Sequence, residues 1–576
     1  MLLPNLTEMP TSREWLDIFL GYNHNLRISE GEFYEMKNMS GDDYPILSPR
    51  AKRGVYKTTG SPRGLVSKDA LCYVDNGTLY IGDQAVADFA LNDEDKTFVS
   101  MGAYLIILPD KKYINTTNHA DKGSIEAQYV STAEVKIELA KANGEAYGEA
   151  ISQDSQPESP NNRMLWIDTS SVPHVLKQYS SATSQWVSLS TTYVKISAVG
   201  IGTRFAVGDG IELSGFAEAS LNGANIVSQR DDNYIVITGL IETNSSQEDA
   251  VTVSRRMPQM DFIIESENRL WGCRSGTAAD GTTVNEIYAC KLGDFKNWNC
   301  FAGLVTDSYA VSVGTDGAFT GAIKHLGYPM FFKEGCVHKI YGSFPSNFQV
   351  QTTPLRGVQR GCEKSLAIVN EVLYYKARGG ICAYDGSLPS EISKALGDIV
   401  YEGAVAGAVG NKYYISMRET GTERYSLFVY DTAKGLWHRE DDTQAKCFCN
   451  HENDLFYIDY ADHYIKSVKG AGVEEYGNVK WEVTTGTIGT DSPDKKYISR
   501  IDVRLKLAVG SRVIISAEYD SDGEWHQLSA MTGVNLRSFA IPIKPRRCDH
   551  LRLRIMGSGE AKIYSICKTI ELGSDV

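Results

Sequence analysis

The sequence predicts an all-β protein: a β-propeller that carries an inserted small β domain and is followed by a C-terminal β-sandwich. Three observations predict it: many aromatic and glycine residues, a recurring unit of strands and turns, and strict alternation near the C-terminus. The 576 residues include 32 Tyr, 18 Phe, 8 Trp and 52 Gly. Aromatic side chains favour strands, glycines favour the tight turns between them, and a chain of this length holds several domains.

The recurring unit is an alternating strand, a turn rich in Gly and Asn, and an aromatic-rich strand. In the last four units the markers Phe331, Tyr374, Tyr414 and Phe456 lie 40 to 43 residues apart. Four short strands need roughly 40–50 residues, and one such blade cannot bury both of its faces alone, so the units predict a propeller. The seven units occupy residues 71–82, 104–107, 261–272, 329–342, 372–386, 412–431 and 454–458.

The period is interrupted between the second and third units, which indicates an insertion from a propeller loop. Within the insertion, residues 165–187 predict a small meander, and residues 193–237 predict strands of a small barrel or sandwich. The expected domains are an N-terminal extended arm at 1–60, the propeller at 61–117 and 258–477, the inserted β module or modules at 118–257, and the sandwich at 478–576.

Residues 500–507 and 550–555 alternate apolar and charged side chains. A period of two puts the apolar side chains on one face of a strand and the charged ones on the other, which is typical of a sandwich. Helix is expected to be scarce, with short pieces at 11–20 and 389–397.

The net charge of -14 is unevenly spread, because residues 478–576 carry +3 and residues 1–477 carry -17. An acidic surface does not favour general nucleic-acid binding. The longest apolar run, Ala103–Leu108, is far shorter than a membrane helix, so no membrane-spanning segment is expected. The first residues lack the pattern of a signal peptide, so we expect synthesis in a reducing cytoplasm.

No catalytic, cofactor-binding or metal-binding residue is expected, and no cofactor, because the nucleophile-elbow, phosphate-loop and zinc-protease motifs are absent from the sequence. Cys447 and Cys449 lack a second close pair and predict packed thiols rather than a zinc site. Residues 521–525 come near an Asp-box turn but misplace its Asp and Trp, which favours a plain hairpin. A glycoside hydrolase working with two carboxylates is disfavoured, yet it stays open.

A group of basic residues near the C-terminus allows two interpretations. It could dock an acidic partner such as the body of a neighbouring copy, or it could be a solvated sheet face whose charges protect an edge; the second interpretation is favoured. This candidate docking stripe consists of Arg500, Arg504, Lys506, Arg546, Arg547, Arg552 and Arg554, with His550 beside them.

Two sets of phrases carry a family resemblance. Residues 20–23, 31–40 and 44–50 read LGYN, GEFYEMKNMS and YPILSPR, and they resemble the opening of tailed-bacteriophage virion proteins. The second set resembles the blade phrases of the tail nozzle (tail tubular protein B) family of short-tailed phages. It comprises NRLWG at 268–272, EIYAC at 286–290, DFKNW at 294–298 and YDTAKGLW at 430–437.

The resemblance implies a non-enzymatic structural protein of the virion tail, assembled in the host cytoplasm. It implies a homo-oligomeric ring, expected to be a hexamer, that contacts the connector or adaptor and other tail proteins and lets DNA pass without sequence-specific binding. An acidic channel wall would repel phosphates and let DNA slide. The alternatives are a host-surface-binding tail hub protein and, from another class, the propeller glycoside hydrolase.

Overall fold

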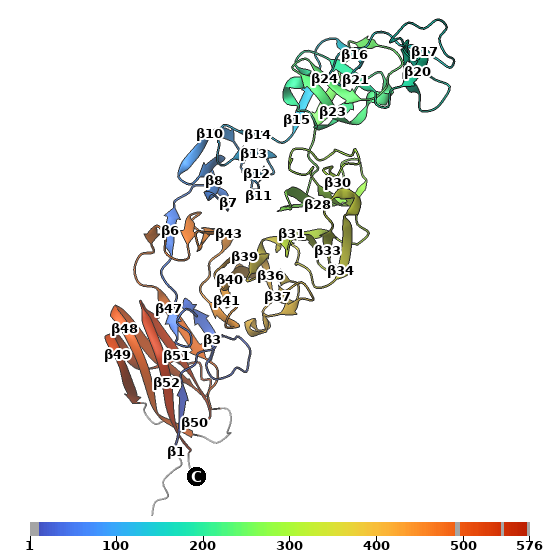
Figure 1. Ribbon diagram of the computed structural model, residues 1–576. Helices are drawn as coiled ribbons and strands as arrows, with labels where there is room; N and C mark the ends of the chain where they lie inside the picture. The colour runs from blue at the N-terminus through green and yellow to red at the C-terminus, as the bar shows by residue number, and fades with distance from the viewer. Residues whose placement is uncertain (1–10, 490–495, 543–546, 573–576) are drawn as a thin grey trace, which may run out of the picture. The chain divides into compact units, whose positions relative to one another are not determined.

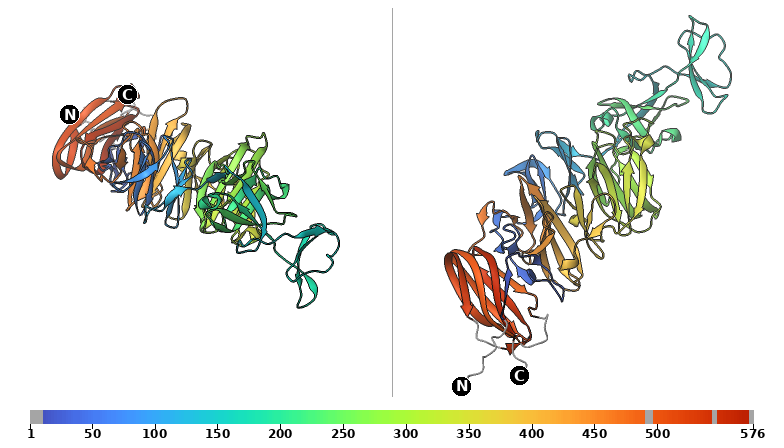
Figure 2. Two further views of the ribbon diagram at one scale, coloured as in Figure 1. Left: turned by 90° about the horizontal axis from the view of Figure 1, so that it is seen from above. Right: turned by 60° about the horizontal axis from the view of Figure 1, so that its bottom comes forward.

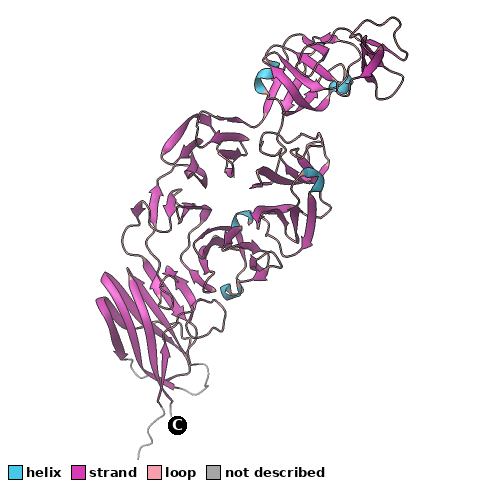
Figure 3. Ribbon diagram, viewed as in Figure 1, coloured by secondary structure: helices cyan, strands magenta, loops and turns pink. Residues whose placement is uncertain are grey.

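The computed structural model describes residues 11–489, 496–542 and 547–572 (Figure 1). Strands dominate, and the helices of the described residues are short 3-10 turns (Figure 3). The predicted all-β class is therefore confirmed. The turns are η1 (Ile201–Arg204), η2 (Ala219–Leu221), η3 (Pro345–Asn347), η4 (Glu363–Ser365) and η5 (Lys394–Leu396).

The chain forms two compact units. The first comprises residues 1–96, 331–338 and 352–576, and the second comprises residues 97–330 and 339–351.

Each of the seven predicted units lies in a small sheet of its own, which confirms the propeller pattern. The first three sheets pair their strands in chain order: β7 (Pro62–Lys68), β8 (Ala70–Asp75), β9 (Thr78–Ile81) and β10 (Gln84–Ala90); β11 (Thr97–Met101), β12 (Tyr104–Leu108), β13 (Lys112–Asn115) and β14 (Lys122–Ser124); β27 (Phe262–Ser266), β28 (Arg269–Thr277), β29 (Thr283–Ala289) and β30 (Tyr309–Ser312).

The next three sheets follow the same rule: β31 (Phe319–His325), β32 (Tyr328–Lys333), β33 (Cys336–Tyr341) and β34 (Gln349–Pro354); β35 (Ala367–Val369), β36 (Val372–Ala377), β37 (Gly380–Tyr384) and β38 (Ser390–Glu391); β39 (Tyr401–Val409), β40 (Lys412–Glu419), β41 (Tyr425–Asp431) and β42 (Leu436–Arg439).

The last sheet joins the two ends of the propeller sequence. Strands β43 (Ala445–His451), β44 (Asp454–Asp459) and β45 (Ile465–Ser467) pair with β6 (Gly54–Lys57) from the N-terminal region, and β46 (Val473–Glu474) pairs with β6 on its other side. A Cβ atom on Gly54 would lie 2.1 Å from the Ala471 carbonyl oxygen, so only glycine allows this approach. Closing a sheet with a strand from far away in the sequence is how a propeller holds its first and last blades together.

The hairpin turns explain why the units recur. Pairs such as Asn76 with Gly77, Asn370 with Glu371 and Glu452 with Asn453 have consecutive positive φ angles. Two positive φ values in a two-residue turn match the twist of antiparallel strands. The second strands of the sheets are buried on both faces, as Tyr413 (0% exposed) and Tyr414 (4%) show in β40. A strand buried on both faces needs a continuous run of large apolar or aromatic side chains.

The insertion forms two sheets. Its eight-stranded sheet consists of β15 (Ala127–Val130), β16 (Val135–Ala140), β21 (Tyr193–Ser197), β22 (Gly210–Ser214), β23 (Gly223–Asp231), β24 (Tyr234–Thr238), β25 (Ser245–Gln247) and β26 (Thr252–Arg255). Its core includes Ile137, Val194, Ile196 and Ile235, all almost fully buried. The second sheet consists of β17 (Ile151–Gln153), β18 (Leu165–Asp168), β19 (Val175–Ser180) and β20 (Gln185–Ser188).

The C-terminal sheet, red in Figures 1 and 2, is organised by the 24-residue strand β48 (Lys496–Tyr519). On one edge β48 pairs first with β52 (Ala561–Leu572) and then with β51 (Leu551–Ser558). On its other edge it pairs with β49 (His526–Pro542). The predicted alternation holds, because Val503, Leu505 and Leu507 are buried while the side chains between them face solvent. Changing partner along one strand lets a single sheet make both layers of the predicted sandwich.

The N-terminal region supplies further strands to this sheet. Strand β1 (Thr11–Leu16) pairs with β52, β3 (Glu32–Lys37) pairs with β47 (Lys480–Thr485), and β2 (Gly21–Tyr22) pairs with β3. Among the C-terminal strands, β47 also pairs with β51, and β50 (Arg547–Cys548) pairs with β48. A separate two-stranded sheet joins β4 (Met39–Ser40) to β5 (Ser48–Pro49).

The predicted helix at 11–20 is wrong, since Thr11–Leu16 pairs antiparallel with β52 from Thr11 opposite Glu571 to Leu16 opposite Ile566. A short segment has little helical stability of its own, and sheet pairing supplies hydrogen bonds that it could not make alone. The segment 389–397 contains β38 and the single turn η5, which Gly397 ends with a φ of 74°.

Candidate functional site

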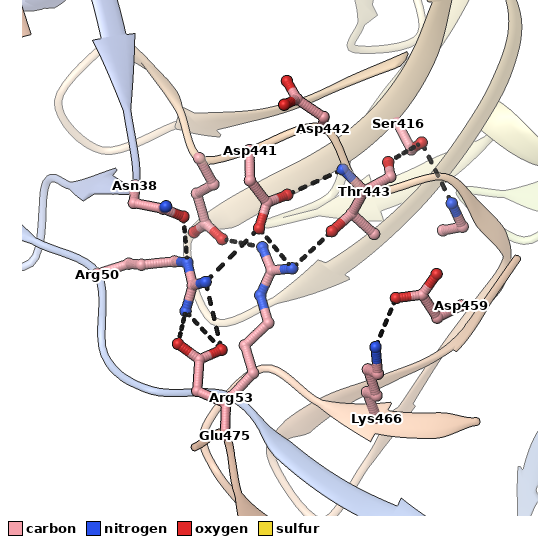
Figure 4. A network of polar contacts seen from close by, with 12 residues as sticks. Asn38, Arg50, Arg53, Ser416, Asp441, Asp442, Thr443, Asp459, Lys466 and Glu475 are labelled. Atoms are coloured by element: carbon pink, nitrogen blue, oxygen red, sulfur yellow. Dashed lines mark hydrogen bonds and ion pairs between the residues drawn. The ribbon is translucent and has the colours of Figure 1, made fainter. Parts of the chain in front are cut away.

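The N-terminal region reaches the propeller through residues 38–54, called the pin segment below. Its Arg53 is 5% exposed and lies among the acids that follow β42 (Figure 4). Nη2 of Arg53 donates to Oε2 of Glu440 at 2.7 Å, and Nη1 lies 2.8 Å from Oδ2 of Asp441. Nη1 also donates to the Thr443 hydroxyl at 2.7 Å and to the Tyr457 hydroxyl at 3.1 Å. The Arg53 guanidinium thus joins the segment just before β6 to the loop after β42 and to β44.

Arg50 extends the same network toward the C-terminal sheet. Its Nε donates to Oδ1 of Asn38 at 2.7 Å, and its Nη atoms lie 3.3 Å from the Glu475 carboxylate and 3.6 Å from Asp441 (Figure 4). Asn38 in turn donates from Nδ2 to the carbonyl of Lys480 in β47, at 2.7 Å. The pin segment therefore bonds through one continuous chain of contacts to the C-terminal sheet and to the last propeller sheet, formed by β43–β46 and β6 and called the closing blade below.

The charges of this network are held in place by their partners. Burial alone would lower the pKa of Arg53, but Asp441, Tyr457 and Glu440 raise it well above its usual value. Burial alone would raise the pKa of Asp441, but Arg53 and Arg50 lower it. Both groups stay charged in the folded protein, and each compensates the other.

His438 fills the space beneath the pin segment. A Cβ on Gly41 would lie 2.7 Å from its ring, so the backbone rests directly on the imidazole. Burial, together with Lys412, lowers the pKa of His438 to about 4, so the ring is neutral at pH 7.

This neutral histidine predicts a pH dependence of stability. Between its usual pKa near 6.5 and about 4, the unfolded chain binds a proton that the folded protein does not, so stability falls as the pH is lowered. From pH 7 to pH 5 the loss should be about 2 kcal/mol. Urea unfolding of the parent and of His438→Gln at both pH values measures it, with His526→Gln as the control. An equal loss in all three proteins would contradict the assignment.

A groove lies beside the network, within the first unit. It has a volume of about 930 Å³ and is lined by Tyr22, His24 and Glu35 from the N-terminal strands and by blade residues that include Tyr401 and Tyr425. Six carboxylates line it: Glu35, Glu419, Glu423, Asp441, Asp442 and Asp459. Acids and tyrosines around an open groove could bind either a basic protein segment or a sugar.

Each of the six carboxylates has a basic partner in this chain. The pairs are Glu35 with His24 (3.6 Å), Glu419 with Arg424 (2.8 Å), Glu423 with Arg418 (3.4 Å), Asp441 with Arg53 (2.8 Å), Asp442 with Lys37 (3.1 Å) and Asp459 with Lys466 (2.7 Å). A carboxylate held by a partner in the chain is directed away from a bound sugar, whereas glycoside cleavage needs two carboxyl groups that flank the scissile bond. The pairing favours a structural role for these acids.

A second buried ion pair anchors the insertion in the second unit. Arg255 at the end of β26 pairs with Asp209, and the two are 7% and 3% exposed. Oδ1 of Asp209 accepts from Nδ2 of Asn297 at 3.0 Å, and Oδ1 of Asn297 accepts from the Gly210 backbone at 2.9 Å. Nε of Arg255 donates to the carbonyl of Ile125 at 3.0 Å. Asn297 follows β29, so the insertion is locked onto that blade.

The candidate docking stripe is divided by the change of partner along β48. Arg500, Arg504 and Lys506 lie on the half that pairs with β52, whereas Arg552 and Arg554 lie on β51, which pairs with the other half. The structure therefore does not bring the two groups into one row. Arg547 is half-buried in β50, and Arg546 lies outside the described residues.

Most members of the stripe already contact an acid or an aromatic ring. Acidic partners are Asp502 for Arg500 (2.7 Å), Glu518 for Arg552 (3.6 Å) and Glu482 for Arg554 (3.3 Å). Arg504 lies 5.8 Å from the centre of the Trp15 ring, and Arg554 lies 3.9 Å from that of Trp525.

The sequence pointed to Arg50 only as part of a family phrase, and Arg53, Glu440 and Asp441 were missed. Two signals were present: a pair of arginines just before β6, and three consecutive acids at 440–442. Neither signal says which residue meets which, because Arg53 and Glu440 are 387 positions apart.

All eleven cysteines are thiols that form no disulfide; nine are buried, and Cys447 and Cys449 are half-buried. The described residues contain no cluster of three or more His, Cys, Asp or Glu that could hold a metal ion. Burial raises the pKa of Cys447 to about 11 and that of Cys449 to about 12.

We therefore expect the native protein to react slowly with the thiol reagent DTNB at pH 8, because the thiolate is the reactive form. In denaturant, all eleven thiols should react at once. Rapid labelling of either half-buried cysteine in the native protein would contradict this description.

No family model and no curated protein matches the sequence. Among solved structures, an exo-β-1,3-galactanase from Phanerochaete chrysosporium has 8% identity and a TM-score of 0.22 over 53% of this chain and 94% of its own. PorZ of the type-IX secretion system of Porphyromonas gingivalis has 12% identity and a TM-score of 0.25 over 92% of this chain and 80% of its own. The endosialidase of phage phi92 has 10% identity and a TM-score of 0.21 over 91% of this chain and 82% of its own. Likenesses this low do not bear on activity or substrate.

Within the described residues, no helix has the length and apolar character needed to cross a membrane.

Proposed function

We propose that the chain is a structural protein of a bacteriophage tail, a nozzle component that forms a homo-oligomeric ring below the connector. In this proposal six copies surround a channel through which DNA leaves without sequence-specific binding. The connector or adaptor and other tail proteins are the remaining partners. Its place is the virion tail, after assembly in the host cytoplasm.

The observation that carries the proposal is the pin segment. The phrase at 44–50, which supports the family resemblance, ends in Arg50, and Arg50 and Arg53 together bind the acids at 440, 441 and 475. The phrase therefore has a mechanical role, since it fixes the C-terminal sheet to the closing blade. A protein that must keep its shape while DNA passes benefits from such internal fastening.

The charge balance agrees with this role. The net charge of -14 disfavours retention of DNA, because binding to phosphates requires basic surface that releases counterions. Antibodies raised against the purified chain should label the tails of intact virions in electron micrographs. Labelling of heads alone, or of host membranes only, would contradict the proposal.

The groove supports a second candidate, the propeller glycoside hydrolase. Its volume of about 930 Å³ and its acid and tyrosine lining would suit a short glycan. Incubation with a glycan panel tests it, using Glu419→Gln and Glu423→Gln to remove single carboxylates. Turnover that either variant abolishes would favour the hydrolase over the nozzle; binding without turnover would favour the host-surface-binding hub.

A further inference from the structure

We infer that copies of this chain join edge to edge through the C-terminal sheet, with β49 of one copy pairing with β1 of the next. The inference rests on the proposed self-assembly and specifies the surface that performs it. The occupant of each open edge is a second copy of the chain.

Strand β1 and the second half of β49, residues 534–542, are the outer edges of one layer. The pairing order in that layer is β1, β52, the first half of β48, and β49. Among the described strands, β1 pairs with β52 alone and β49 pairs with β48 alone. Residues 12–16 of β1 and residues 535–541 of β49 therefore present rows of backbone N–H and C=O groups on their outer sides, which can pair with another strand.

The strand directions make the two edges complementary. Every pair in the layer is antiparallel, so β1 and β49 run in opposite directions. A second copy placed beside the first in the same orientation presents its β1 antiparallel to β49, and the alternation continues across the junction. One kind of contact then uses both edges of every copy, as a closed ring requires.

The composition of β49 fits an edge that is covered in the assembly. Natural edge strands are usually protected by charges, by prolines or by shortness. β49 is 17 residues long. Counting Asp, Glu, Lys and Arg, it contains a single charged residue, Arg537, and its single proline, Pro542, is its last residue. Leu536 is 54% exposed, and on the opposite edge Trp15 is 54% and Ile18 is 48% exposed.

The register across the layer shows which residues of the two edges would lie opposite each other. Trp15 is opposite Cys567, Cys567 is opposite Asp502, and Asp502 is opposite Ala540. With no stagger between copies, Asp17 of one copy therefore lies level with Ser538 of its neighbour. Asp17, one residue beyond β1, and Ser538 then face the same side of the joined sheet, because directly opposed residues of paired strands share a face.

Cysteine cross-linking tests the junction. Asp17→Cys is combined in one chain with Leu536→Cys, Ser538→Cys or Ala540→Cys, which covers a stagger of two residues either way. Opposed residues of paired strands lie close enough for a disulfide. After mild oxidation of the full-length protein with connector rings, at least one double variant should give a ladder of multimers on a denaturing gel. Mixed single variants should give dimers only.

The controls separate this junction from other arrangements. The parent chain reports any background from its own cysteines. A dimer from Ser538→Cys alone would show two-fold pairing of β49 and overturn the inference. Rings in electron micrographs without any cross-link would also overturn it while leaving the nozzle proposal intact. Cross-linked open filaments instead of rings would support the junction and contradict the nozzle.

A charge substitution gives a second readout. Leu536→Lys should reduce assembly at least tenfold, because it places a charge on the covered edge. Leu388→Lys changes an equally large leucine, 68% exposed in a blade loop, and should assemble like the parent. Equal assembly by both variants would contradict the junction.

Discussion

Arg53→Met is expected to lower the free energy of unfolding of the first unit by about 3–5 kcal/mol. The change removes the cation that compensates the buried Glu440, and it leaves the half-buried Asp441 with Arg50 as its partner. A buried carboxylate without a partner keeps its full desolvation cost. Urea unfolding measures the loss, and hydrogen exchange should show that β6 and β44 lose protection first.

The matched control is Arg63→Met, which removes a surface arginine paired with Asp93 at 2.8 Å. Solvent screens this pair, so the variant should keep nearly the stability of the parent. If Arg53→Met were as stable as Arg63→Met, the network in Figure 4 would not hold the pin segment in place.

Arg255→Met should have a similar cost, about 3–5 kcal/mol, but in the second unit. Here the uncompensated acid is Asp209, which also holds Asn297 of the neighbouring blade. We expect the insertion to loosen first, because this cluster is its polar anchor. Limited proteolysis should then cut between residues 125 and 257 at protease concentrations that spare the parent, and hydrogen exchange should rise in β22 and β26.

Arg230→Met serves as the control within the same module. Its partner Asp232 is 3.6 Å away, and both side chains are exposed. This variant should resist proteolysis like the parent. Equal sensitivity of the two variants would mean that any change in the module loosens it, and that the Arg255 pair is not its anchor.

The sequence predicted those parts of the fold that depend on local patterns. Turn residues such as Asn76 and Gly77 adopt positive φ more readily than other residues, so the seven units could be recognised without knowing their neighbours. The alternation around Val503 and Leu505 likewise survived in the structure. Turn chemistry and a period of two are properties of a few consecutive residues.

Features that depend on distant partners could not be predicted in the same way. Residues 11–16 form a strand because β52, about 550 positions later, offers them an edge. The docking stripe is divided because β48 changes partner midway, which no alternation pattern signals. The groove acids were too numerous in an acidic chain for their pairing with particular cations to be foreseen.

The nozzle proposal is tested most directly by negative-stain electron microscopy of the purified chain added to purified connector rings. We predict a second ring stacked on the connector, with a central channel and the same number of copies in every particle. Connectors that stay bare while the chain remains a single 63.6 kDa particle would contradict the proposal.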